Sequence, residues 1–241
     1  MISVIIPTLW KGEGLFDLLD KVTAHQKIGE VIIVDNNRAN RPNESALDHK
    51  KITFLPQKEN IYVNPAWNLG AKEAEYERLC FLSDDLEFDV KVFDEVYDKI
   101  NTTNGVIGIN ARAIKNFYVR SPLVEAKPIY DLGGDWDGFG TLMFVHKSNY
   151  LPIPDELKIY WGDTWLWDYN AVQCRQNYTI EKFCLKTKMR TSSSLFKDVI
   201  AEEETVFLEL FKKMYKEQEK SGKMLSCLMA ENVYNLIKEY A

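Results

Sequence analysis

Short apolar runs alternate with segments of helical periodicity between residues 2 and 109. The runs at residues 2–6, 31–34, 52–55, 79–82 and 106–109 are each short and apolar, as expected for buried strands. This alternation predicts an α/β fold, with a mostly parallel central sheet flanked by helices on both faces. The helices are indicated by apolar residues at every third or fourth position, namely Leu15, Leu18, Leu19 and Val22, then Ala66, Leu69, Ala71 and Ala74, then Val92, Phe93, Val96 and Ile100.

The second of these helices has a specific start signal. Asn64 precedes Pro65 in the sequence. Asparagine is favoured at the N-cap of a helix, and proline is favoured at the first helical position. We therefore expect this helix to begin at Pro65, with Asn64 as its cap.

The pattern changes after residue 110. Residues 112–140 have weak periodicity and contain four glycines, which indicates an irregular loop with short strands, of the kind that lines a site. Residues 141–145 predict a further strand. A helix is expected to begin at Asp163.

The C-terminal part of the chain carries two helical stripes of apolar residues. One starts near Glu202 and the other follows Gly222. We expect the chain to divide into an α/β domain at residues 1–195 and a C-terminal helical extension at residues 196–241.

Composition and charge narrow the classes of function. The 241 residues carry a net charge of −6, which argues against a protein held to nucleic acid by phosphate neutralisation alone. No cysteines form a C-x-x-C pair, and no apolar run approaches the ~18 residues of a membrane span. We therefore expect a cytoplasmic protein with reduced thiols. A local surface that binds nucleic acid is still compatible with the sequence, because a basic track includes Lys182, Lys186, Lys188 and Arg190.

Acidic residues follow two of the predicted strands. Asp84 and Asp85 come after the run at residues 79–82, and Asp35 ends the run at residues 31–34. The carboxyl ends of parallel strands meet at one edge of an open α/β sheet, where ligands bind. There, carboxylates suit Mg²⁺ or Mn²⁺, and an acid after the second strand suits a ribose hydroxyl or a base N–H. A solvated turn explains the acids at least equally well.

Glycine-rich phosphate loops are absent from the sequence. Neither G-x-G-x-x-G nor G-x-x-x-x-G-K-[ST] occurs, which disfavours a Rossmann dinucleotide enzyme and a P-loop kinase. A nucleotide bound at this sheet would therefore need a metal ion for its diphosphate.

A second candidate site lies around Asp163. Trp161, Trp165 and Trp167 surround this carboxylate in the sequence. Aromatic faces stack on sugar rings or bases, and a carboxylate among them can have a raised pKa and act as a general base. The simpler interpretation, an N-cap aspartate beside core tryptophans, is slightly favoured by the sequence alone.

Taken in order, these segments resemble a family-2 glycosyltransferase with the GT-A fold. The resemblance spans residues 1 to about 175 and rests on the order of its motifs. In sequence these are IIPT, VDNN, ENIYVNPAWNLGAK, FLSDDLEF, GTLMFVHKSNY and PDELKIYWGDTWL.

The resemblance assigns roles to six residues. It implies that Thr8, Asp35, Asn68 and Asp84 bind the nucleotide-sugar donor, with Asn68 lying in an A-R-N-x-G motif that here reads AWNLG. The metal-binding D-x-D motif corresponds to Ser83-Asp84-Asp85, in which Asp85 is the metal ligand and Ser83 replaces the first acid. The E-D pair of the family corresponds to Gly162-Asp163, which makes Asp163 the catalytic base.

The function implied by this resemblance is a metal-dependent, inverting glycosyltransferase. It would use Mn²⁺ or Mg²⁺ and move a sugar from a nucleotide-diphospho-sugar, with a UDP-sugar expected, to an acceptor hydroxyl. Carbohydrate is the expected acceptor, and a modified base in DNA is a minor alternative. Three other interpretations stay open: a nucleotidyltransferase of similar fold, a non-catalytic carbohydrate-binding or scaffold protein, and a purely structural protein, which the acids at the strand ends make least attractive.

Overall fold

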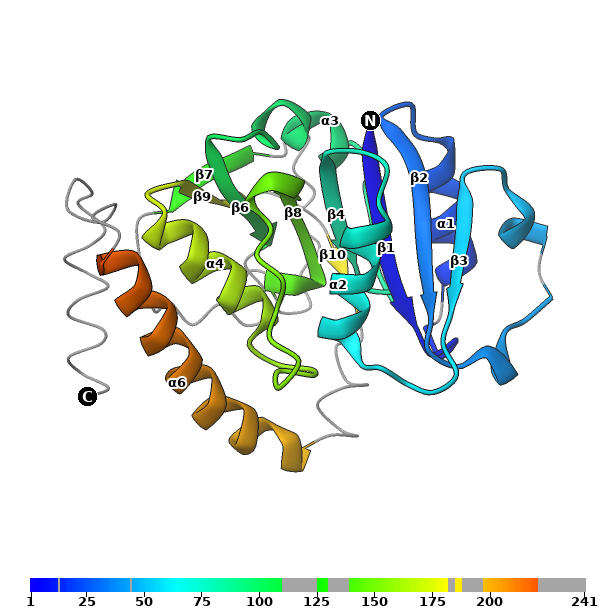
Figure 1. Ribbon diagram of the computed structural model, residues 1–241. Helices are drawn as coiled ribbons and strands as arrows, with labels where there is room; N and C mark the ends of the chain where they lie inside the picture. The colour runs from blue at the N-terminus through cyan, green and yellow to red at the C-terminus, as the bar shows by residue number, and fades with distance from the viewer. Residues whose placement is uncertain are drawn as a thin grey trace.

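The computed structural model describes residues 1–12, 14–43, 45–109, 125–129, 139–181, 185–187 and 197–220 (Figure 1). Within these residues, eight strands form one sheet, in the order β3-β2-β1-β4-β8-β6-β9-β7, and β5 and β10 form a separate pair. In chain order the elements are β1 (Ile2–Thr8), α1 (Leu15–Ala24), β2 (Ile28–Asp35), β3 (Ile52–Pro56), α2 (Val63–Glu73), β4 (Arg78–Leu82), β5 (Glu87–Phe88), α3 (Val92–Val96), β6 (Asn104–Ile109), β7 (Glu125–Ile129), β8 (Leu142–His146), α4 (Gly162–Val172), β9 (Gln176–Glu181), β10 (Leu185–Lys186) and α6 (Lys197–Lys220).

The large sheet is parallel in the half built by the first strands. β3, β2, β1 and β4 all run in the same direction, as the alternation of strands and helices predicts. The other half is mixed, because β8 pairs antiparallel with both β4 and β6, and β7 pairs antiparallel with β9. Because β1 runs parallel to both β2 and β4, the carboxyl ends of these three strands lie together along one edge of the sheet.

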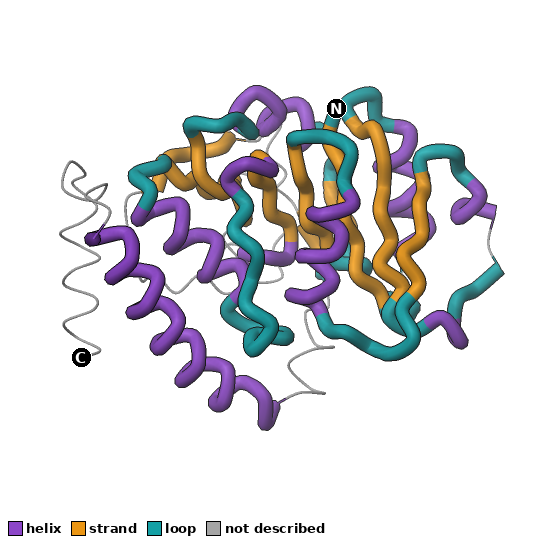
Figure 2. The backbone as a smooth tube through the Cα atoms, viewed as in Figure 1, coloured by secondary structure: helices purple, strands orange, loops and turns teal. Residues whose placement is uncertain are grey.

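Helices cover both faces of the sheet, and successive strand residues divide between the two faces. Val4 and Ile6 of β1 pack with α1 and α3, whereas Ile5 between them packs with α2, α4 and α6. Figures 1 and 2 show α2, α4 and α6 together on the near face. All three β1 side chains are fully buried, which explains why this strand reads as an apolar run interrupted only by Ser3.

The predicted start of α2 is wrong by two residues. The helix begins at Val63, its N-cap is Tyr62, and Pro65 occupies the third position of the first turn. Proline is tolerated there because the first backbone N–H groups of a helix have no intrahelical acceptor. The side chain of Asn64 does not cap the helix; its amide donates to the carbonyls of Leu157 and Tyr160 at 3.1 and 3.0 Å.

The C-terminal stripe from Glu202 forms the long helix α6. Its side chains Phe207, Phe211 and Met214 are buried in the same apolar cluster as α2 and α4. The division into units at residue 195 stays a prediction, and the expected helix after Gly222 lies outside the described residues. Among the helices that are described, none is both long and apolar enough to cross a bilayer.

Candidate active site

The ends of β1 and β4 are joined by a short hydrogen bond. The hydroxyl of Thr8 donates to Oδ2 of Asp84 at 2.6 Å and accepts from the backbone N–H of Trp10 at 2.8 Å. The loop after β1 also lies directly against this aspartate, since a Cβ on Gly12 would come within 2.3 Å of the Asp84 carbonyl oxygen. Two predicted donor-binding residues, Thr8 and Asp84, are therefore in contact.

A pocket of about 130 Å³ opens at this edge of the sheet. Thr8 and Asp84 line it from the strand ends, Asn36 lines it from the end of β2, and Trp67 and Ile159 close it from the side of α2 and the loop before α4. The pocket thus collects residues from five separate segments of the chain at the carboxyl ends of parallel strands, where open α/β sheets bind ligands.

Three of the four described non-glycine residues with positive φ lie around the pocket; the fourth, Cys174, follows α4. Trp10, Tyr62 and Trp161 have φ values of 61°, 67° and 65°, in the left-handed region that non-glycine residues rarely adopt. Each residue lies in a loop that borders the pocket. Such strain persists only where surrounding contacts hold it, and it clusters at functional sites.

Asp84 and Asp85 form a pair of carboxylates without a described cationic partner. Burial, together with the nearby charge of Asp85, raises the pKa of Asp84 to about 6, although the hydrogen bond from Thr8 acts in the opposite direction. Asp85 is half-buried and accepts a hydrogen bond from the Thr187 hydroxyl at 2.9 Å. In the described part of the chain, neither carboxylate belongs to an ion pair.

This pair fits a hard divalent cation, because two adjacent carboxylates supply the oxygen ligands that Mg²⁺ and Mn²⁺ prefer. No cluster of three or more His, Cys, Asp or Glu side chains occurs among the described residues. The remaining ligands would therefore be phosphate and water oxygens, as is common for Mg²⁺.

The basic track predicted near Lys186 is described only at that residue. Lys186 of β10 forms an ion pair with Glu87 of β5, with 3.0 Å between Nζ and Oε2. Its charge is therefore partly compensated at the surface. The other three members of the track lie outside the described residues.

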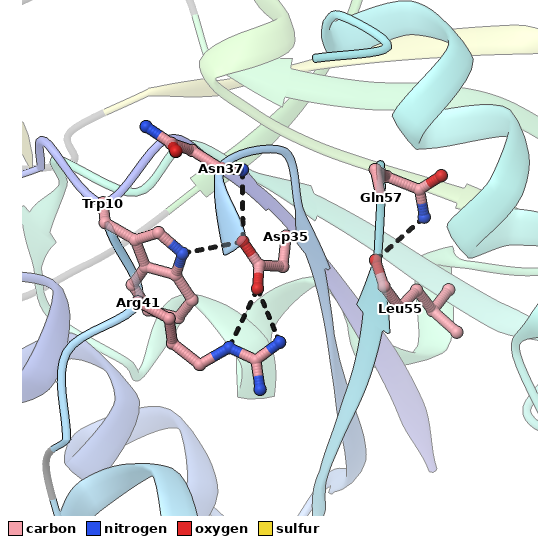
Figure 3. A network of polar contacts seen from close by, with 6 residues as sticks. All are labelled: Trp10, Asp35, Asn37, Arg41, Leu55 and Gln57. Carbon is pink, nitrogen blue, oxygen red and sulfur yellow. Dashed lines mark hydrogen bonds and ion pairs between the residues drawn. The ribbon is translucent and has the colours of Figure 1, made fainter. Parts of the chain in front are cut away.

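Asp35 lies at the end of β2, directly beside Thr8 in the sheet, and is fully buried. Figure 3 shows its carboxylate surrounded by donors. One oxygen accepts from the indole N–H of Trp10 at 2.8 Å and from the backbone N–H of Asn37 at 3.1 Å. The other accepts from Nε and Nη2 of Arg41 at 2.8 and 2.6 Å.

These four bonds fill the acceptor sites of the Asp35 carboxylate. Its predicted contact with a nucleotide stays a prediction and would require Trp10 or Arg41 to move.

Arg41→Met tests this arrangement. The variant removes the cation from a fully buried carboxylate, so we expect the free energy of unfolding to fall by about 1–3 kcal/mol. Arg38→Met is the matched control, because Arg38 is exposed and three residues away. Urea unfolding of both variants measures the difference; equal stabilities would show that Arg41 does not compensate Asp35.

Asp163 lies in the first turn of α4 and is not among the pocket-lining residues, although Ile159 of the preceding loop is. Its carboxylate accepts from the backbone N–H groups of Gly140 and Thr164, both at 2.9 Å. Gly140 lies tightly between Asp163 and Trp67, since a Cβ there would come within 3.1 Å of the Asp163 Cβ and 2.7 Å of the Trp67 ring. The next residue, Thr141, accepts from the backbone N–H of Ser83 at 3.0 Å. Residues 140 and 141 therefore connect Asp163 to the segment that carries Asp84 and Asp85.

Asn68 has a different position from the other predicted donor-binding residues. Its amide donates to the carbonyl of Ile153 at 2.7 Å and accepts from the Tyr150 hydroxyl at 2.7 Å and the Ile153 N–H at 2.9 Å. These bonds attach α2 to the segment after β8. Asn68 is not among the pocket-lining residues, and its role in donor binding stays a prediction.

The tryptophans around Asp163 belong mostly to the core. Trp165 and Trp167 are buried, and Trp167 packs edge-on against Phe139. Trp161 is half-buried and stacks on Phe207 of α6, with ring centroids 5.0 Å apart. The simpler interpretation therefore agrees with their burial as core packing, but its N-cap aspartate is wrong, because α4 begins at Gly162 with Trp161 as the N-cap.

The sequence analysis did not identify Asp168, which is five residues after Asp163 on α4. Its side chain is buried, and burial raises its pKa to about 8, with the nearby charge of Asp163 acting in the same direction. The signal in the sequence was an acid within the otherwise apolar and aromatic stretch of the helix. Asp168 adds a protonated carboxyl group next to the candidate base.

Asp168→Asn tests this protonation through stability. The folded protein keeps the Asp168 proton up to about pH 8, whereas the unfolded chain loses it near pH 4. Between these values the folded state binds more protons, so this group lowers the free energy of unfolding as pH rises. Each tenfold change in proton affinity corresponds to about 1.4 kcal/mol. We therefore expect the variant to match the native protein near pH 4 and to exceed its stability by a few kcal/mol at pH 8.

Chemical unfolding at several pH values measures this difference. Asp155→Asn is the control, because Asp155 is exposed. A stability difference between Asp168→Asn and the native protein that does not change with pH would contradict the assignment.

Solved structures with a similar fold are glycosyltransferases. S. aureus TarS, residues 1–349, has a TM-score of 0.53 and 17% identity, over 74% of this chain and 57% of that one. GalNAc-T7, solved with UDP, GalNAc and Mn²⁺, has a TM-score of 0.55 and 10% identity, over 78% and 43%. The mannosyltransferase PcManGT from Pyrobaculum calidifontis, solved with GDP-Man and Mn²⁺, has a TM-score of 0.53 and 16% identity, over 74% and 54%. The chain thus spans about half the length of these proteins, and the predicted GT-A fold is confirmed.

Comparison of the sequence with known families identifies the family of the chain. No curated protein matches the chain. The profile described as Glycosyl transferase family 2 matches residues 3–153, which is more than half of the sequence and includes Thr8, Asp35, Asp84 and Asp85. The chain therefore belongs to glycosyl transferase family 2.

Proposed function

We propose that this chain transfers a sugar from a nucleotide-diphospho-sugar to an acceptor hydroxyl with inversion at the anomeric carbon. The observation that carries this proposal is the placement of three acids. Asp84 lines the pocket after β4 with Asp85 next to it in the chain, and Asp163 at the start of α4 is joined to this segment through residues 140 and 141. The Mn²⁺ complexes of GalNAc-T7 and PcManGT, which contain UDP with GalNAc and GDP-Man, support a donor of this class.

The donor would bind over the ends of β1, β2 and β4. Thr8 and Asp84 line the pocket there, and Asn36 lies on the β2 side. Asp35 would act by holding Trp10 and Arg41 in place, since all its acceptor sites are occupied. A UDP-sugar is the donor we would test first.

Asp85, with Asp84 beside it, would hold a divalent cation. When bound, such a cation neutralises the charge that develops on the departing diphosphate. Thr8 and Thr187 orient the two carboxylates by hydrogen bonds to one oxygen of each. These contacts fix the carboxylates before any ligand arrives, which reduces the ordering cost of binding.

Asp163 would accept the proton of the acceptor hydroxyl. As the acceptor oxygen forms its bond to the anomeric carbon, the bond from that carbon to the diphosphate oxygen breaks, and the diphosphate leaves with the electron pair. The proton passes to the Asp163 carboxylate. The transition state has oxocarbenium-ion character, and attack from the face opposite the leaving group inverts the configuration. The two N–H donors from Gly140 and Thr164 hold the carboxylate in one orientation.

A panel of nucleotide-sugars tests this function. We expect one donor to raise the melting temperature in the presence of Mn²⁺, because a ligand at a hundredfold excess over its dissociation constant stabilises by about 2.7 kcal/mol. Product analysis then distinguishes the alternatives. Release of a nucleoside diphosphate with a new glycosidic bond supports sugar transfer, whereas release of pyrophosphate from a nucleoside triphosphate indicates a nucleotidyltransferase. Sugar binding without turnover of any donor indicates a carbohydrate-binding protein.

A further inference from the structure

A buried carboxylate on α6 binds the backbone of the loop that precedes α4. Glu203 is 3% exposed, and its two oxygens accept from three consecutive backbone N–H groups. Oε1 accepts from Lys158 at 2.8 Å and from Ile159 at 3.2 Å. Oε2 accepts from Ile159 at 3.2 Å and from Tyr160 at 2.7 Å. Figure 1 shows α6 running alongside α4, with its N-terminal end near this loop.

This contact fixes the path of the loop. Consecutive N–H groups that converge on one anion form a concave binding site, and hydrogen bonds to an ionised acceptor are about twice as strong as neutral ones. A buried carboxylate that loses its donors is costly, so Glu203 and the three peptide groups stabilise each other strongly. The loop cannot take another path without leaving the charge unpaired.

Two further contacts hold the same loop. Trp161, which follows the Glu203-bound segment in a left-handed conformation, stacks on Phe207, one turn further along α6. From the other side, Asn64 of α2 binds the Leu157 and Tyr160 carbonyls through its side chain and the Lys158 carbonyl through its backbone N–H at 3.0 Å. The loop is therefore clamped between α2 and α6.

The clamped loop leads directly to the candidate catalytic group. Ile159 lines the pocket, and Asp163 is the third residue after the last N–H bound by Glu203. The start of α4, and with it the direction of the Asp163 carboxylate, depends on how the loop enters the helix. α6 does not line the pocket; it reaches the site through this loop and through its packing against α4.

We propose that Glu203 is a positioning residue for sugar transfer, which acts by holding residues 158–160 so that Asp163 faces the acceptor. This inference rests on the proposed function of Asp163. It gives the C-terminal helix a role in turnover and not only in stability. Of the three residues that Glu203 binds, only Ile159 lines the pocket, and among the described residues Glu203 forms no hydrogen bond with the ends of β1, β2 and β4.

Glu203→Gln tests the inference with little change in side-chain volume. The amide nitrogen replaces one acceptor oxygen with a donor that faces backbone N–H groups. We expect faster hydrogen–deuterium exchange at the amides of residues 158–160 and a fall in kcat of about 10- to 100-fold, the size associated with a misplaced catalytic group. The dissociation constant for the free nucleoside diphosphate should equal that of the native protein.

The matched control is Glu204→Gln, since Glu204 is the next residue and is exposed. It should leave both exchange and kcat unchanged. Glu203→Asp keeps both oxygens on a shorter side chain, so we expect it to recover part of the lost kcat; it also serves if Glu203→Gln does not fold. If Glu203 only stabilised the fold, then Glu203→Asp and Glu203→Gln with equal melting temperatures would also have equal kcat.

The outcomes separate this inference from the proposed function. Unchanged exchange at residues 158–160 in Glu203→Gln overturns the clamp, and faster exchange with native kcat overturns its role in positioning. If Asp163→Asn keeps native turnover, the proposed base is wrong whatever the exchange shows. Loss of nucleotide affinity in Glu203→Gln would place its effect in general folding and would also overturn the inference.

Discussion

Asp163→Asn is expected to lower the rate of sugar transfer by about 10²–10⁴-fold, the usual contribution of a general base. The amide has nearly the same shape as the carboxylate and keeps one acceptor for the N–H groups of Gly140 and Thr164, but it cannot accept the acceptor's proton. Donor binding should be retained, because Thr8, Asp84 and Asp85 are unchanged. The loss should therefore appear in kcat and not in the dissociation constant of the donor.

The control for this variant is Asp155→Asn, which changes an exposed aspartate in the segment before α4. Steady-state kinetics of both variants, with thermal shifts to measure donor binding, separate chemistry from binding. Turnover of Asp163→Asn close to that of the native protein would remove Asp163 from the role of base.

Asp85→Asn should produce the second largest effect, a loss of about 10²-fold or more in metal-dependent turnover. A bound cation that stabilises a departing diphosphate contributes several kcal/mol, and each 1.36 kcal/mol corresponds to about tenfold in rate. Removing one of two adjacent carboxylates weakens the site for that cation. It also removes a like charge from Asp84, so Asp84 should hold its proton less tightly in the variant.

Metal removal gives the matching result in the native protein. A chelator should abolish sugar transfer, and added Mn²⁺ should restore it in the native chain but only weakly in Asp85→Asn. The control is Asp89→Asn, an exposed aspartate four residues further along. Full activity of Asp85→Asn at low Mn²⁺ would show that this carboxylate is not a metal ligand.

The strands β1, β2 and β4 could be predicted because most of their residues are buried on both faces; β3, at the edge of the sheet, was expected to be buried but is only partly so. For this reason residues 79–82 read as a continuous apolar run and residues 2–6 as one interrupted only by Ser3. The polar residues that follow both runs mark the edge where the pocket lies. The mixed half of the sheet could not be predicted. The direction of β8 depends on where the chain returns after residue 109, and no local pattern encodes that.

Side-chain partners distant in sequence were the main limit on predicting the site. Asn64 has the sequence signal of a helix cap, yet its side chain donates hydrogen bonds to the loop at residues 157–160. Asp35 has the position of a ligand-binding acid, yet Arg41 and Trp10 occupy it. Glu203 lies in an acidic run that reads as solvated surface, and only the fold reveals the three N–H groups that it binds. Local periodicity predicts the element but not these contacts.

A crystal structure of the chain with Mn²⁺ and a non-hydrolysable nucleotide-diphospho-sugar tests the central claim most directly. We predict a cation bound by Asp85 at about 2 Å, the diphosphate beside it, and the anomeric carbon facing the Asp163 carboxylate across a space for the acceptor. A donor bound at another surface, or one whose anomeric carbon faces away from Asp163, would contradict the account.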